Sequence, residues 1–225
     1  SPMALGGVLE WSIASGAILS NITMKERFNG YLPVVIDVET GGTNASTDAL
    51  LEIGVVFIGI NEQGQLTPTV TDHFNIQPFE KSRITDEALR INKIKPYHPF
   101  RFAKEEKKAL GDLFDLIRQK LKETQCTRAV LVGHNAHFDL SFLHAAVERN
   151  RLSQMPFHQF TCFDTATLGA VAYGQSVLAR ALKKAQIDFD KEQAHTALYD
   201  AKVTAELFCT IANCFDIHCS CESQV

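Results

Sequence analysis

Residues 33–39 read Pro-Val-Val-Ile-Asp-Val-Glu, an apolar and largely β-branched run that ends in two carboxylates. Such a continuous run predicts a strand that is buried on both faces of a sheet. Asp37 and Glu39 are two residues apart, so both side chains leave the same face of this strand. Burying two adjacent carboxylates costs on the order of several kcal/mol, which a bound divalent cation removes. A strand end that opens into water would also explain the pair.

The pattern around this strand is that of a single α/β domain. Residues 50–60 and 67–76 read as two more strands with turn residues between them, which predicts an antiparallel meander. Helical spacing of apolar residues then alternates with short strands. We expect strands at 129–133 and 160–163, and helices at 104–124, 138–149, 165–173, 176–185 and 197–213. The fold class is therefore α/β, with a mixed β-sheet flanked by helices.

A second acidic motif, Gly-His-Asn-Ala-His-Phe-Asp at 133–139, lies where an expected strand passes into a helix. The carboxyl ends of strands are where α/β sheets place their functional sites. Asp139 at the start of the helix is thus a candidate metal ligand. A carboxylate that only favours the positive end of the helix dipole is the alternative.

A third motif, His-Thr-Ala-Leu-Tyr-Asp at 195–200, pairs an imidazole with a carboxylate. Residues five apart are about 140° apart around a helix, so His195 and Asp200 cannot share a helical face. We expect His195 on the loop before a helix and Asp200 in its first turns. Histidine titrates near neutral pH and can accept a proton from water, whereas the aspartate can bind metal. Taken alone, both could be ordinary surface residues.

Together, the three motifs supply four carboxylates and one imidazole, which is what two-metal phosphodiester hydrolysis requires. Oxygen ligands favour Mg²⁺ or Mn²⁺ over zinc. We interpret the chain as a nuclease.

Composition limits the remaining choices. A chain of 225 residues that is 45% hydrophobic and 21% charged suits one well-packed globular domain. The net charge of −4 and the pI near 6.1 exclude a generally basic surface, so a local patch must meet any polyanion. Six cysteines without framework spacing indicate reduced thiols, as in the cytosol. With no targeting segment or membrane span recognised in the sequence, we expect a cytoplasmic protein that does not associate with a membrane.

The two ends of the sequence carry weaker signals. Residues 1–23 fit neither a signal peptide nor a membrane span, and we expect them to be a leader before a natural start at Met24. His218, Cys219 and Cys221, with Cys214 nearby, faintly resemble a zinc site. A tail of incidental thiols explains them better, because no second pair of ligands exists elsewhere.

The three motifs resemble those of the DEDDh 3′→5′ exonucleases: Asp37-x-Glu39-Thr40, His134-Asn135-x₃-Asp139 and His195-x₄-Asp200. The branch of that superfamily that uses tyrosine would have Tyr at position 196, where this chain has Thr196. The resemblance implies a ribonuclease H-like fold over 24–216, with 217–225 as a tail. It also implies two Mg²⁺ ions per site, which Mn²⁺ can replace. The implied metal ligands are Asp37, Glu39, Asp139, Asp200 and His195, with Asp37 bridging the ions and His195 also the general base.

Further stretches are similar to one branch of that family, which trims the 3′ ends of transfer RNA and other stable RNAs and also degrades single-stranded DNA. These stretches are 31–40, 47–53, 156–160, 163–166 and 193–200. The resemblance implies release of nucleoside 5′-monophosphates. It also implies stacking of terminal bases on Phe138 and Phe160 and a hydrogen bond between Glu87 and a base. Thr43 and Ile91 stand where the family usually has Phe. For Phe138 and Phe160, packing in the core remains an alternative, and Asp164 is interpreted as a helix cap.

Members of that branch work as homodimers, in which a basic patch of one subunit feeds RNA into the site of the other. The resemblance implies that Arg27, Lys122 and Arg128 form this patch. Further candidates on the neighbouring helix are Lys104, Lys107, Lys108, Arg118 and Lys120. Interspersed glutamates also allow an ordinary solvated helix face.

Two other functions remain possible at this point. A proofreading exonuclease of a DNA polymerase shares all three motifs, although the stretches around Tyr31 and Phe160 favour the RNA-trimming branch. An inactive RNA-binding domain on the same fold is the second, and the complete set of five site residues argues against it.

Overall fold

The computed structural model describes residues 22–215. The expected leader, apart from Ile22 and Thr23, and the tail at 217–225 lie outside the described residues, as do His218, Cys219 and Cys221. The first described segment is already structured, because the Thr23 hydroxyl accepts a hydrogen bond from the Glu26 amide and caps helix α1 (Met24–Arg27).

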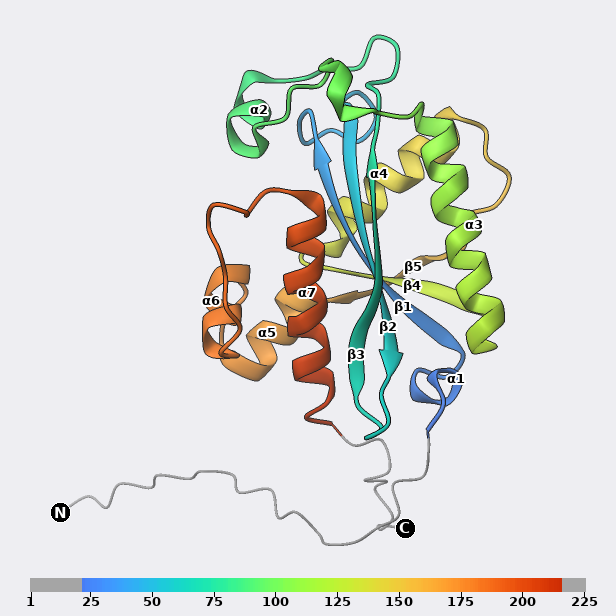
Figure 1. Cartoon of the computed structure of the whole chain (residues 1–225), viewed down its shortest axis with the longest axis vertical. Helices are drawn as coiled ribbons and strands as arrows, with labels where there is room; N and C mark the ends of the chain where they lie inside the picture. Colours follow the sequence, from blue (N-terminus) through green and yellow to red (C-terminus); the bar gives the residue numbers. More distant parts are fainter. Residues whose placement is uncertain (1–21, 216–225) are drawn as a thin grey trace, which may run out of the picture.

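A five-stranded sheet forms the centre of the molecule, in the order β3-β2-β1-β4-β5 (Figure 1). Strands β1 (Tyr31–Thr40), β2 (Leu50–Ile60) and β3 (Leu66–Asn75) form the expected antiparallel meander. Strands β4 (Arg128–Gly133) and β5 (Phe157–Asp164) are added in parallel to β1. The predicted mixed sheet is confirmed, and β1 lies at its centre, which explains the continuous apolar run of that strand.

Helices cover both faces of this sheet (Figure 1). Helices α3 (Glu106–Thr124) and α4 (Ala136–Arg149) lie on one side. Helix α7 (Ala197–Ala212) packs across β1, β2 and β3 on the other side, with α5 (Thr165–Tyr173) and α6 (Leu178–Lys184) beside it. The main core between these layers is aliphatic and aromatic, and a smaller cluster joins α6 to α7 through Ala181, Leu182 and Leu207. No helix among residues 22–215 is both long enough and apolar enough to cross a membrane.

The expected elements differ from the structure mainly at their ends and in the segment between β3 and α3. Helix α2 (Asp86–Asn92) and a 3₁₀ turn at Pro99–Arg101 occupy this segment, for which no element was predicted. The capping residue Thr85, followed by two acidic residues, was the available signal. Helix α4 begins at Ala136 rather than 138, so Phe138 and Asp139 both lie in its first turn.

Candidate active site

The central strand β1 extends beyond its parallel neighbour, and this creates the site. Pairing of β1 with β4 stops at Val35, because β4 ends at Gly133 and the chain turns into α4. The amide of Val38 therefore has no strand partner on this edge, and it donates to Asp139 Oδ1 at 2.9 Å. Asp139 is buried, so this contact fixes its carboxylate beside the strand that carries Asp37 and Glu39.

Gly54 brings helix α7 to the opposite edge of the site. It pairs directly with Asp37, and a Cβ at this position would come within 2.3 Å of the backbone oxygen of Ala197. Only glycine lets the first turn of α7 approach the sheet this closely. Asp200, in that first turn, is thereby placed against the face of β1. Sequence reasoning missed Gly54, since its role depends on a helix more than 140 residues away.

His195 and Asp200 lie as expected on the loop and in the following helix. His195 precedes α7 and has a left-handed backbone (φ 65°), a conformation that histidine tolerates better than most residues. Its amide donates to Asp200 Oδ2 at 3.1 Å, which ties the loop to the helix and leaves the exposed imidazole free to turn.

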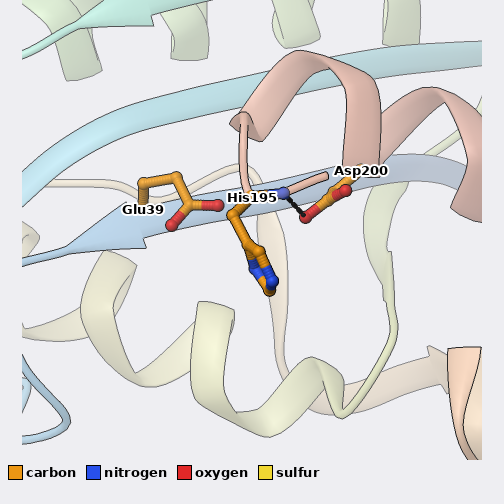
Figure 2. A group of neighbouring side chains, drawn as sticks. All are labelled: Glu39, His195 and Asp200. Atoms are coloured by element: carbon orange, nitrogen blue, oxygen red, sulfur yellow. Dashed lines mark hydrogen bonds between the residues drawn. The ribbon is translucent and has the colours of Figure 1, made fainter. Parts of the chain in front are cut away.

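Glu39, His195 and Asp200 converge, each with one potential ligand atom within 4.8 Å of the others (Figure 2). The second oxygen of Asp200, Oδ1, is buried and has no hydrogen-bond partner within the described part of the chain. A buried carboxylate oxygen without a donor is costly unless a cation faces it. The convergent donors, the carboxylates of Glu39 and Asp200 and the imidazole of His195, fit a divalent cation with oxygen preference. Asp37 and Asp139 are outside this convergent group, although repulsion from Asp139, Asp200 and Glu39 acts on Asp37.

Electrostatics support the same interpretation. Burial, and then repulsion from Asp200 and Glu52, raises the pKa of Glu39 from its ordinary value of 4.5 to about 9. Burial, followed by repulsion from Asp139, Asp200 and the other acids, raises the pKa of Asp37 well above its usual range. Desolvation likewise raises the pKa of Asp139 and of Asp200. Without a cation, these groups therefore hold protons that solvated carboxyls would have lost.

This proton uptake predicts that metal binding and stability depend on pH. Between the ordinary carboxyl pKa of 4.5 and the raised value of about 9, the metal-free fold binds more protons than the unfolded chain. Its stability must therefore fall as the pH rises through this window, whereas the gain on adding metal must grow, since the cation displaces those protons. We expect a fixed Mg²⁺ concentration, about 100 times its Kd at pH 8, to raise Tm by roughly 5–10 °C at pH 8 and by clearly less at pH 6, where its Kd is higher. Thermal unfolding with MgCl₂ or EDTA measures this, and an equal gain at both pH values contradicts it.

Asp164 caps helix α5, as the sequence predicts, and it also binds the start of helix α4. Its carboxylate accepts hydrogen bonds from the amide of Ala166 in α5 and from the amides of Asn135 and Ala136 at the start of α4. It therefore holds together the two helix starts that follow β4 and β5. Asp139 depends on this contact for its position, a role that the sequence does not reveal.

A cavity of about 390 Å³ adjoins Glu39, between the end of β1, the start of α4 and helix α2. Phe138, Glu87, Thr43 and Ile91 all line it, so four positions discussed from the sequence meet at one place. The ring of Phe138 packs on Phe142 at 4.9 Å and still faces the cavity. Phe160, on β5, lies outside this lining but is 78% exposed, which contradicts the alternative of core packing for this residue.

Arg83 is a cavity residue that sequence reasoning missed. Its guanidinium makes two hydrogen bonds, of 2.7 and 3.1 Å, to the fully buried carboxylate of Asp48. The hydrogen bond from Arg83 is the main reason that the pKa of Asp48 falls to about 2. Asp48 also accepts from the Asn44 amide, so the pair fixes the loop that carries Thr43. Such a bidentate pair has no signature in sequence spacing.

The three expected basic residues lie at the other end of β1. Arg128 pairs with Tyr31 in the sheet, six residues before Asp37, which is about 20 Å along a strand. Lys122 and Arg128 are exposed. Arg27 is engaged within the fold, because its guanidinium donates to the backbone oxygens of Ala212 and Phe215. Lys104 lies before α3 rather than on it, and most of the additional candidates form ion pairs: Lys104 and Lys108 with Asp112, Arg118 with Asp115, and Lys120 with Glu123.

A ribonuclease H-like sheet with a convergent acidic site at the end of its central strand defines a metal-dependent nuclease. The sequence profile of a family described as Exonuclease matches residues 34–208. The chain is 54% identical to ribonuclease T of Vibrio campbellii over 193 residues, which cover 85% of this chain and 90% of that protein. Ribonuclease T of Vibrio cholerae is 52% identical and covered over 86% of its length. The chain belongs to the ribonuclease T family of DEDDh exonucleases and is a 3′→5′ exoribonuclease.

Solved structures with similar folds agree with this family. The nuclease domain of 3′hExo, a DEDDh member solved with bound rAMP, superposes with a TM-score of 0.63 at 22% identity, over 79% of this chain and 89% of that one. A 3′-exonuclease solved with a histone mRNA stem-loop gives a TM-score of 0.65 at 20% identity, over 81% and 63% of the two chains. At these identities the likeness establishes the ribonuclease H-like fold alone.

Proposed function

We propose that this exoribonuclease uses Mg²⁺, or Mn²⁺ in its place, to trim the 3′ ends of transfer RNA and other stable RNAs, and that it also degrades single-stranded DNA. The products are nucleoside 5′-monophosphates. The observation that carries this proposal is the convergence of Glu39, His195 and Asp200 with the unpartnered Asp200 Oδ1. Family membership implies dependence on a divalent metal, and the oxygen-rich donor set favours Mg²⁺.

In this mechanism the carboxylates of Asp37, Glu39, Asp139 and Asp200 would hold the two cations. Bound Mg²⁺ would make water a better nucleophile and stabilise the charge that develops on the phosphate. Two contacts keep the carboxylates in place before substrate arrives: the Val38 amide on Asp139 and the His195 amide on Asp200. The imidazole of His195, on its exposed loop, accepts the proton of the attacking water and would also serve as a metal ligand.

The 3′-terminal nucleoside is proposed to enter the cavity beside Glu39. The ring of Phe138 gives its base an apolar face, and Glu87 offers a hydrogen-bond acceptor. Phe160 is exposed on β5 and available to a further base. Thr43 and Ile91 give this cavity fewer aromatic faces than the family usually has.

Ile91→Phe is therefore expected to tighten substrate binding. Ile91 is 51% exposed and lines the cavity, so a phenyl ring there can stack on the terminal base. At the lower end of the energy of base stacking, KM for a short RNA should fall about fivefold. The matched control is Val70→Phe, since Val70 is exposed on β3 and outside the cavity lining. An unchanged KM in Ile91→Phe would exclude Ile91 from the base-binding surface.

We further propose that the protein works as a cytoplasmic homodimer. Arg128 pairs with Tyr31, about 20 Å from Asp37 along β1, which is too far to hold the scissile end of RNA in its own subunit. Together with Lys122 and Arg27, it suits a substrate that is bound across two copies. The buried thiols of Cys126 and Cys209 are free, in keeping with a reducing compartment.

A time course on three 5′-labelled substrates tests the proposed function: transfer RNA with its CCA end, single-stranded DNA, and a primer with a mismatched 3′ end. Each is incubated with Mg²⁺ and with EDTA. Stepwise, Mg²⁺-dependent loss of the terminal nucleotide of the tRNA is the expected result. Preference for the mismatched primer would support proofreading instead. Absence of cleavage with all three substrates would support a binding domain.

A further inference from the structure

Three aromatic side chains stand out from the surface between α2 and α3. Tyr97, Phe100 and Phe102, here called the aromatic shelf, are 78%, 77% and 81% exposed. The rings of Phe100 and Phe102 lie 6.4 Å apart, and His98 lies 5.4 Å from Phe100. A cavity of about 350 Å³ opens beside Tyr97, His98 and Phe102. A cluster of exposed rings of this kind marks an interaction site.

The fold holds the aromatic shelf in this outward position. Between the two phenylalanines, Arg101 points inward, and its guanidinium donates to the backbone oxygens of Leu51 and Pro96, both at 2.8 Å. The backbone oxygen of Arg101 accepts from the side-chain amide of Asn75 at 2.8 Å. Phe102 adopts a left-handed backbone (φ 49°), which is uncommon for an aromatic residue. Anchored by Arg101, Phe100 and Phe102 cannot turn into the core.

The segment that carries the aromatic shelf is basic. Residues 90–104 contain five Lys or Arg and no Asp or Glu, whereas the whole chain has 22 basic and 26 acidic residues. Of the five, Arg101 points inward and Lys104 pairs with Asp112. Lys93 and Lys95 are exposed and form no ion pair among the described residues. Aromatic rings interleaved with cations are the features that bind single-stranded nucleic acid, through base stacking and phosphate contacts. A hydrophobic protein partner would not account for the basic bias.

The aromatic shelf lies at the same end of the molecule as the active site. Glu39 pairs with Glu52 across the sheet, and Glu52 pairs with Asn75, which holds Arg101. Two strand spacings, about 10 Å, therefore separate Glu39 from the anchor of the aromatic shelf. Figure 1 shows α2 and the segment after it above the end of β1 and the start of α7. With about 3.4 Å per stacked nucleotide, three or four nucleotides span this distance.

We propose that the aromatic shelf binds the single-stranded RNA on the 5′ side of the two terminal nucleotides. Bases of the third and following nucleotides from the 3′ end stack on Tyr97, Phe100 and Phe102, and Lys93 and Lys95 contact the phosphates. The proposal rests on the exonuclease function of the adjoining site. The affinity for RNA would then depend on the length of its single-stranded 3′ end. The aromatic shelf would bind the RNA on the same subunit that cleaves it.

Kinetics on oligoadenylates of two and ten nucleotides test this proposal, with the triple variant Tyr97→Ala/Phe100→Ala/Phe102→Ala beside the wild type. The expected result is a KM for the decamer that rises about 30- to 150-fold, as loss of two or three stacks of about 1 kcal/mol each implies. KM for the dinucleotide, and kcat for both substrates, should stay within about twofold of the wild type. Phe215→Ala, which removes an exposed ring elsewhere, is the matched control. Fluorescence anisotropy of the labelled decamer in EDTA should show the same loss of affinity without turnover.

A second variant tests the charged part of the proposal. For Lys93→Gln/Lys95→Gln, the slope of log K against log salt should flatten by about 1.4, since two phosphate contacts are lost. Equal KM values for the decamer in the triple variant and the wild type would overturn the proposal. The proposal would also be overturned if the wild-type protein sediments as a homodimer and the triple variant as a monomer, since the aromatic shelf would then be a protein interface. Failure of the wild type to cleave either oligoadenylate, the dinucleotide included, would instead overturn the proposed function.

Discussion

Asp37→Asn is expected to lower kcat for RNA by at least about 10³-fold. The substitution keeps the shape of the side chain but removes the anion that lies between the other carboxylates, and metal ligation at such a site contributes several kcal/mol to transition-state stabilisation. In the structure Asp37 is the residue whose pKa is raised by burial and by four neighbouring acids, so it is the centre of the negative charge. Single-turnover cleavage of a 5′-labelled RNA in Mg²⁺ measures the loss.

The same variant should be more stable than the wild type in EDTA. Removing one buried acid relieves repulsion that no cation offsets there, so Tm should rise while activity falls. Asp72→Asn is the matched control, since this carboxylate is exposed on β3 and is not among the acids that raise the pKa of Asp37. A near-normal rate for Asp37→Asn would overturn the assignment of the site. A lower Tm in EDTA would mean that Asp37 supports the fold rather than metal binding.

The second large effect is expected from His195→Asn. Loss of a general base costs about 10²- to 10⁴-fold in rate. Asparagine tolerates the left-handed backbone of this position, and the amide that donates to Asp200 is retained, so the carboxylates of the site should stay in place. The variant should therefore still bind Mn²⁺ through its carboxylates and turn over slowly even at saturating Mn²⁺.

The pH dependence of the rate separates a base from a merely structural residue. In the wild type, log kcat should rise with pH until the imidazole is deprotonated, and in His195→Asn this rise should be absent. His137→Asn serves as the control, because His137 is exposed in α4 and makes no contact that the mechanism uses. If His195→Asn keeps the pH profile of the wild type at a reduced rate, His195 positions Asp200 and a different group accepts the proton.

Local sequence pattern was enough to predict the parts of the site that lie within one element. The two-residue spacing of Asp37 and Glu39 placed both on one strand face, and the five-residue spacing of His195 and Asp200 correctly placed the histidine on a loop. Asp164 was correctly predicted to cap α5. In each case a period or a capping rule connects neighbouring residues.

Contacts between distant segments could not be predicted in this way. Gly54 matters because α7 passes over it, and Arg83 because Asp48 is buried beside it. Helix α2 was missed because seven residues are too few for a clear helical period, yet it forms one wall of the cavity. The resemblance to a family had marked Glu87 and Ile91, but only the fold brings them together with Thr43 and Phe138.

The most direct test of the account is to identify the products released from a uniformly labelled single-stranded RNA while Mg²⁺ is titrated. The account predicts nucleoside 5′-monophosphates, removed one at a time from the 3′ end, with a sigmoidal dependence on Mg²⁺ that reflects two ions. Asp37→Asn should release none at any Mg²⁺ concentration used. Internal fragments, nucleoside 3′-monophosphates, or cleavage that continues in EDTA would contradict the account.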